Sequence, residues 1–142
     1  MAMMKSRRIR TLQRGLLAAV CFAGALHAQA QNSAMPAMKG DGAMRWVCGG
    51  IGSDESTAMR GAMKSHPLSL LFARKDGAYL ADVDVRIQGT AGAPALTLRA
   101  NGPVCLVDLP AGRYTIEANA EGMSQKQDVT LGGTPRTADF RF

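Results

Sequence analysis

Residues 109–122 read LPAGRYTIEANAEG, and this stretch decides the fold class. It opens on a Pro-Ala-Gly turn, because proline fixes one backbone angle and glycine accepts conformations that other residues avoid. Tyr114, Ile116 and Ala118 then recur at every second position, as side chains on one face of a β-strand do. A Glu-Gly pair after the strand indicates another turn. The stretch therefore predicts a strand with one face on a core and the other in water.

Similar short segments on both sides predict the remaining strands. They are expected at residues 68–73, 79–87, 95–100, 104–109, 113–120, 124–131 and 137–142, with Gly, Pro, Asn or Asp in the turns between them. In the second segment we expect Tyr79 and Val83 to face the core, and Leu80 and Asp82 to face the solvent. Seven or so short strands at this spacing predict a mainly β, two-sheet sandwich.

The segment 45–73 differs from the rest, because it includes a helical period. Residues 45–48 predict a short strand that ends at a Gly-Gly pair, and Ser53 is expected to cap a helix whose first turn is acidic. With the strand at 68–73 this makes a strand–helix–strand unit, with its helix at one end or edge of the sandwich. Residues 31–44 show no period and predict a flexible leader, so 45–142 is expected to be a single domain.

The motif Leu-Pro-x-Gly-x-Tyr-x-Ile, with a glycine after the strand, resembles the signature of carboxypeptidase regulatory-like domains. The resemblance covers residues 79–142. It implies structural roles for four residues: Pro110, Gly112 and Gly122 in turns, and Tyr114 as a tyrosine that faces the core. It implies an immunoglobulin-like or transthyretin-like β-sandwich without enzymatic activity, in roles from folding support to carbohydrate or partner binding. Small exported bacterial proteins known only by this domain are also similar. The N-terminal strand–helix–strand unit is not supplied by the family pattern.

The first thirty residues predict a signal peptide that is removed on export to the periplasm or the exterior. Basic residues precede an apolar run of 11 residues, 16–26, and Ala28-Gln29-Ala30 offers small residues for cleavage before Gln31. The run is short of the roughly 20 residues that span a bilayer, so no transmembrane anchor is expected. Five of the 17 Lys and Arg lie in this signal and no acid does, which leaves 12 basic against 11 acidic residues. No nucleic-acid partner is therefore expected.

Two cysteines, Cys48 and Cys105, remain after the signal. In an oxidising compartment an even pair favours a disulfide, which would tie the strand–helix–strand unit to the sandwich. The alternative is two separately buried thiols. The disulfide requires Cα atoms no more than about 7 Å apart, so residues 46–48 would lie beside the 104–109 strand or face it across the core.

Catalytic chemistry has little support in the sequence. His66 is the only histidine after the signal, no Gly-x-Ser-x-Gly elbow occurs, and no catalytic residue is predicted. Asp82 and Asp84 lie on one expected strand face and would supply only two of the six or more oxygens that calcium needs. A solvated face with Arg86 compensating the two acids is favoured. No cofactor is expected.

Copper is the sharpest alternative function. Thioether sulfur and imidazole suit Cu(I), and such side chains are frequent in the first third of the mature chain: Met35, Met38, Met44, Met59, Met63 and His66. Methionine is also an ordinary filler of cores. The favoured hypothesis is an exported, monomeric binding module for an unknown protein partner or envelope ligand, which uses a sheet edge or the helix-bearing end.

Overall fold

The computed structural model describes residues 34–91 and 95–142, and the expected signal peptide with its cleavage site lies outside them. Over these residues the fold is mainly β, with two sheets and one short α-helix. The five-stranded sheet has the order β1 (Lys39–Asp41), β2 (Met44–Gly49), β6 (Val104–Asp108), β3 (Leu68–Ala73) and β9 (Arg136–Arg141). The four-stranded sheet has the order β5 (Leu96–Ala100), β4 (Val83–Gly89), β7 (Gly112–Ala120) and β8 (Met123–Leu131). Neighbouring strands are antiparallel except β3 and β9.

The main core lies between the two sheets, which confirms the sandwich architecture. Phe72 of β3 and Phe140 of β9 stack at a centroid distance of 5.7 Å, and both are buried. Tyr114, Ile116 and Ala118 meet them from the other sheet, as the alternation of β7 predicts. The apolar face of each strand is thus removed from water, which is the dominant favourable term in folding.

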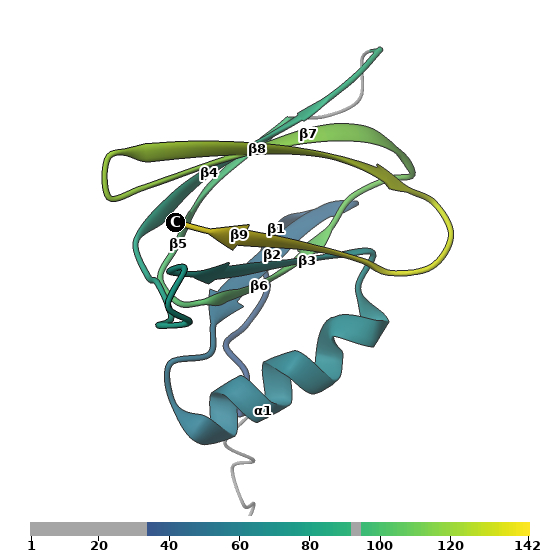
Figure 1. The fold of residues 1–142 in the computed structure, drawn as a ribbon. Coiled ribbons are helices and arrows are strands. Elements are labelled where there is room, and N and C mark those ends of the chain that lie inside the picture. The colour runs from purple at the N-terminus through teal and green to yellow at the C-terminus, as the bar shows by residue number, and fades with distance from the viewer. Residues whose placement is uncertain (1–33, 92–94) are drawn as a thin grey trace, which may run out of the picture. The chain divides into compact units, whose positions relative to one another are not determined.

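A second, smaller core lies on the outer face of the five-stranded sheet, beneath α1 (Ser53–Ala62) and the 3₁₀ turn η1 (Met63–Ser65). Figure 1 shows three layers, with α1 on the far side of this sheet from β7 and β8. Met59 of the helix packs with Val47, Val104 and Leu106 of β2 and β6. The helix therefore covers a sheet face, and the expectation that it packs at an end or edge is wrong. Its two flanking strands are members of the sheet, on either side of β6.

The expected strand at 79–87 begins only at Val83. Asp82 has φ of 59°, a left-handed conformation that breaks the alternation, so that Tyr79 is exposed and Leu80 is buried. The face assignment of both residues was therefore wrong. The backbone explains the result, because the amide of Leu80 donates to the carbonyl of Phe72, and Tyr79 bridges to Ala73. Backbone hydrogen bonds therefore hold residues 79 and 80 beside the end of β3.

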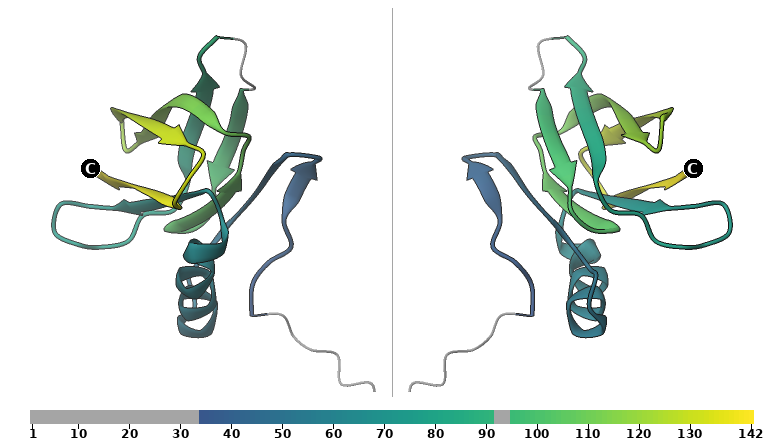
Figure 2. Two further views of the ribbon diagram at one scale, coloured as in Figure 1. Left: turned by 90° about the vertical axis from the view of Figure 1, so that its right-hand side faces the viewer. Right: turned by 90° about the vertical axis from the view of Figure 1, so that its left-hand side faces the viewer.

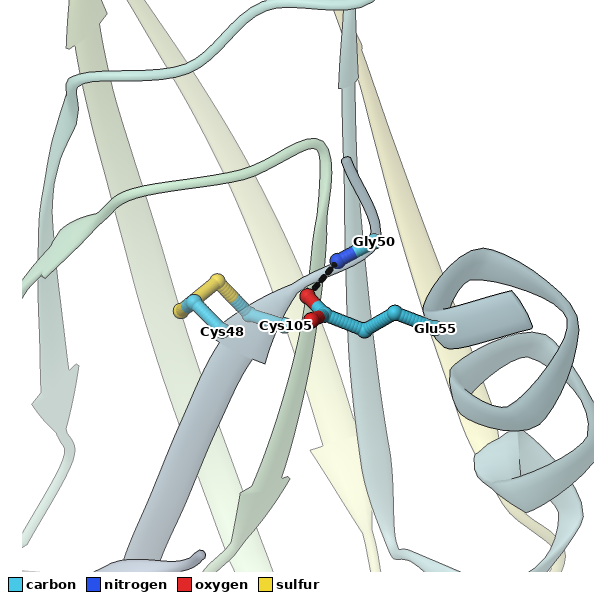
Figure 3. Close-up of a disulfide and its surroundings, with 4 residues drawn as sticks. All are labelled: Cys48, Gly50, Glu55 and Cys105. Carbon is cyan, nitrogen blue, oxygen red and sulfur yellow. Dashed lines mark hydrogen bonds between the residues drawn. A yellow bond between two sulfur atoms is a disulfide. The ribbon is translucent and has the colours of Figure 1, made fainter. Parts of the chain in front are cut away.

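The N-terminal segment and the helix start also depart from expectation. Residues 34–44 of the expected flexible leader include β1, which forms a hairpin with β2 (Figure 2). Positive φ angles occur at Gly40 within β1 and at Gly42 in the turn. Gly52, and not Ser53, is the N-cap residue of α1, and it makes no side-chain capping bond. Glu55 instead accepts a hydrogen bond from the amide of Gly50 at 2.6 Å, which satisfies a free donor just before the helix (Figure 3).

The Cys48–Cys105 disulfide is present, with a Cα–Cα distance of 4.1 Å. The two residues are direct partners in the pairing of β2 with β6, so the bond lies within one sheet and on its core side (Figure 3). The alternative of separate thiols is wrong. The geometric expectation that residues 46–48 lie beside the 104–109 strand is confirmed.

The turn motif at residues 109–122 has the expected structure. The ring of Tyr114 is buried, and its hydroxyl donates to the carbonyl of Pro110 at 2.7 Å. Burial raises the pKa of this phenol. Glu121 and Gly122 both have positive φ and join β7 to β8 in a two-residue hairpin turn. Within the described residues, no helix has the length and apolar character needed to cross a membrane.

Candidate functional site

Two exposed apolar side chains gather at one end of the five-stranded sheet. Ile51 is 74% exposed and Tyr79 is 63% exposed, and both line a shallow pocket of about 230 Å³. Its other lining residues include Ala81 and Pro103, so three loops meet here: β2–α1, β3–β4 and β5–β6. We call Ile51, Tyr79, Ala81, Pro103 and the neighbouring Arg60 the Tyr79 surface.

The backbone holds the loops of this surface in place. In the β3–β4 loop, the amide of Ala78 donates to Asp76 Oδ1 at 3.0 Å, and the amide of Arg74 donates to the carbonyl of Ala78 at 2.7 Å. The carbonyl of Pro103 accepts from the amide of Phe72 at 3.0 Å. The loops are therefore pinned to β3, and the exposed side chains are presented from fixed positions.

Arg60 of α1 orients the tyrosine. Its Nη2 donates to the hydroxyl of Tyr79 at 3.0 Å, and its guanidinium lies 5.3 Å from the centroid of the same ring. Arg60 also donates through Nε to the hydroxyl of Ser56, one helical turn earlier. An ordered Arg–Tyr pair at the surface loses little further rotamer freedom when it binds a partner.

An open groove of about 480 Å³ continues from Arg60 along the helix toward β9. Its lining residues are Arg60, Met63, Lys64, Pro135 and Thr137. Two of these are cationic and none is acidic, while Met63 and Pro135 supply apolar area. The groove therefore offers positive charge next to an apolar floor.

His66 follows η1 at the C-terminal end of the helix, and an acid binds it. Its Nδ1 is 2.6 Å from Asp108 Oδ1, and Arg45 Nη2 donates to the other oxygen of Asp108 at 3.1 Å. The buried Ser69 hydroxyl has no hydrogen-bond partner among the described residues. His66 and Asp108 therefore join the end of η1 to β6.

The paired aspartates are neutralised by a different arginine from the one expected. Arg99 of β5 lies 3.1 Å from Asp84 and 3.5 Å from Asp82, so it takes the compensating role that we assigned to Arg86. Register explains the exchange, because Arg99 is the direct cross-strand partner of Asp84. The pocket of about 350 Å³ above them also includes Glu121, which is paired with Arg74. Each of its three acids is thus already paired with an arginine, and two of them share Arg99.

The edge strands of the two sheets differ in how open they are to pairing with another chain. Gln125 and Gln127 of β8 donate through their side-chain amides to the carbonyls of Arg141 and Asp139 on β9, the second at 2.6 Å. These bonds close the β8–β9 side of the sandwich with side chains. The edge strands on the other side are β1 and β5, and β1 is a three-residue strand with exposed charges. Short charged edges discourage pairing, so β5 is the more open of the two.

The methionines of the copper hypothesis separate into two groups. Met35, Met38, Met59 and Met63 pack in the small core under α1. Met44 packs against the main core on the other face of the sheet, and His66 is bound to Asp108. The structure therefore does not bring all six expected ligands together.

The Tyr79 surface was missed in the sequence because its members come from three loops and a helix. The sequence offered one signal: Asp82 interrupts the strand just before Val83. The expectation of strict alternation from residue 79 ignored this interruption. No protein-family model matches this chain, and no curated protein matches it in sequence. Among the described residues, no group of three or more His, Cys, Asp or Glu side chains is placed to hold a metal ion.

Proposed function

We propose that this chain is an exported, monomeric binding module without enzymatic activity, and that it docks a protein partner on the Tyr79 surface. The observation that carries the proposal is the exposure of Ile51 and Tyr79 at one pocket beside Arg60. Tyrosine and arginine are enriched among the residues that dominate binding energy in protein interfaces. Large exposed apolar side chains cost solubility, and a partner that covers them removes that cost.

The charge of the neighbouring groove suggests the chemistry of the partner. Arg60 and Lys64 face the groove without an acidic lining residue. A partner segment with an apolar side chain for the Tyr79 pocket and a carboxylate for the groove would match both features. The proposed ligand is therefore an acidic protein segment. The proposed binding site is therefore formed by the loops at one end of the five-stranded sheet beside α1, and the more open β5 edge is the second route.

The family and the compartment belong to the same proposal. The turn, the buried Tyr114 and its bond to Pro110 support a carboxypeptidase regulatory-like domain of the transthyretin-like or immunoglobulin-like kind. The disulfide supports folding in an oxidising compartment, the periplasm or the exterior. The proposed family and the proposed compartment both fit an envelope protein that works by binding another protein.

Photo-crosslinking in the native host tests the proposal. A photoreactive amino acid at Tyr79 or at Ile51 is expected to capture one protein, and the same group at Lys126 on β8 serves as the control, because that side chain is 65% exposed on the other sheet. The Lys64→Glu variant should weaken the crosslink, whereas Arg86→Glu, at an exposed position on β4, should not. Equal capture from Tyr79 and Lys126, or none from Tyr79 and Ile51, would reject the surface.

A further inference from the structure

Four thioethers share the small core between α1 and the five-stranded sheet. Met59 is completely buried there, and the half-buried Met35, Met38 and Met63 pack against the same cluster. They come from two segments, the stretch before β1 and the helix with its 3₁₀ end. The other members of the cluster are apolar, among them Val47, Val104 and Leu106.

This arrangement has the flexibility that a metal site made of thioethers needs. Met59 and Met63 are one helical turn apart and so share a helix face. Met35 and Met38 are three residues apart in a segment that crosses to the same cluster. Methionine has three rotatable bonds, so its sulfur can turn toward an ion without moving the backbone. The three half-buried members give an ion a route from solvent.

A carboxylate lies beside the buried sulfur. A side chain built on Gly49 would meet both Glu55 Oε1 and Met59 Sδ, so the two groups flank the same backbone position. Glu55 is half-buried and is fixed by its bond to the amide of Gly50 (Figure 3). Thioethers are neutral, and a buried cation needs a counter-charge. Glu55 can supply it.

We propose that Met35, Met38, Met59 and Met63 bind one Cu(I) ion, with Glu55 as the compensating charge. Soft thioether ligands select Cu(I) over harder divalent ions. Both cysteines of the described residues are bonded in the disulfide, so neither offers a competing thiolate there. The site differs from the set suggested by sequence alone, because Met44 faces the other core and His66 is held by Asp108. Met63 also lines the groove beside Arg60, so the metal site adjoins the proposed docking surface.

A titration with a competing chelator tests the site. The mature protein with its disulfide intact receives Cu(I) as the acetonitrile complex under nitrogen, in competition with bathocuproine disulfonate. One equivalent is expected to bind. With ¹³C-labelled methionine methyl groups, the signals of the four ligands should shift in the NMR spectrum and those of Met44 and Met123 should stay. A thiol assay at the end excludes binding by reduced cysteines, which also prefer Cu(I).

Leucine variants separate the metal site from simple core packing. The Met35→Leu/Met38→Leu double variant keeps side-chain volume, so its thermal midpoint should stay near that of the wild type. Loss of outer contacts to a metal already costs about 10–100-fold in affinity, so loss of two ligands should cost at least about 100-fold. Met123→Leu, at an exposed position on β8, is the matched control and should bind as the wild type. The proposal is overturned if the chelator removes all copper from the wild type, if the double variant binds equally well, or if the shifted methyl signals are those of Met44 and Met123.

Discussion

The two sheets of the sandwich differ in how many of their faces are covered. The five-stranded sheet has the main core on one face and α1 on the other, so Val104, Cys105, Leu106 and Val107 of β6 are all buried. The four-stranded sheet has one covered face, and β4 alternates strictly between buried and exposed residues up to Gln88. The disulfide, the Tyr79 surface and the methionine cluster all involve the first sheet. Because both of its faces are covered, the five-stranded sheet can hold the loops at its end in fixed positions for binding. The four-stranded sheet covers the main core from the other side.

The largest effect is expected where the two sheets meet, at Tyr114. Replacement by alanine empties a large buried volume and should lower the free energy of unfolding by about 3–5 kcal/mol. Tyr114→Phe removes only the hydrogen bond to Pro110 and should cost about 0.5–1.5 kcal/mol. Urea unfolding of both variants measures the difference. Equal losses would mean that the hydroxyl, and not the ring, joins the sheets.

The outer faces of the two sheets give the direct comparison. Leu106 is fully buried beneath α1, and Leu106→Ala should cost about 2–5 kcal/mol. Arg86 occupies an exposed position on β4, and Arg86→Ala should stay within about 0.5 kcal/mol of the wild type. If both changes had small effects in thermal or urea unfolding, α1 would contribute little to the fold.

The disulfide should stabilise the same sheet by about 2–4 kcal/mol, since it closes a long loop in the unfolded chain with a sequence separation of 57 residues. The Cys48→Ala/Cys105→Ala double variant measures this, with reduced wild type as a second test. Hydrogen exchange should locate the loss at β2 and β6, which the bond joins. A uniform loss of protection across both sheets would show instead that the domain opens only as a whole.

A smaller effect is expected at the hairpin tip of the four-stranded sheet. Gly122 has φ of 75°, which costs other residues about 1–2 kcal/mol, and a methyl group there would meet no neighbour. Gly122→Ala should therefore destabilise by about that amount, through backbone strain alone. Gly61, where an added Cβ also meets nothing within 4 Å, is the control in a helix, and Gly61→Ala should be stabilising by up to about 1 kcal/mol.

The smallest effect concerns the ion pair between the same hairpin and the β3–β4 loop. The hydrogen bond from Arg74 lowers the pKa of Glu121 below its usual 4.5. A lowered pKa means that the pair stabilises the fold above the unfolded pKa and loses this contribution as pH falls through the folded value. NMR titration of the Glu121 carboxyl should show the lowered pKa, and Arg74→Ala should return it toward 4.5. An unchanged titration in that variant would assign the shift to another group.

Sequence reasoning succeeded for strands whose alternating pattern reflects contact with a single core. Alternation predicted the core faces of β7 and β9 because those faces meet only the main core. It failed at Tyr79 and Leu80, where one left-handed residue, Asp82, reverses the faces and the bonds to β3 decide the outcome. The segment 34–44 was misjudged because its order comes from pairing with β2 and from contacts under the helix, which a local pattern does not record.

The candidate sites were harder to foresee because they combine distant segments. The expected strand at 45–48 left Met44 in the leader. Had the strand been extended to Met44, alternation would have placed it on the face of Cys48 and away from Val47, and so outside the copper set. Nothing local to Ile51, Tyr79 or Pro103 indicates that three loops meet. Only the order of strands brings them together.

The glutamine bonds from β8 to β9 also limit how copies of this protein can associate. Growth of a fibril requires a free strand at both ends of a continuous sheet. Here Gln125 and Gln127 occupy carbonyls at one end of the five-stranded sheet. If a second copy pairs at β1, the far end of the joined five-stranded sheet is again β9, whose carbonyls the same side chains occupy. Pairing through β1 alone then ends at two copies, and a filament would also need the β5 edge of the other sheet.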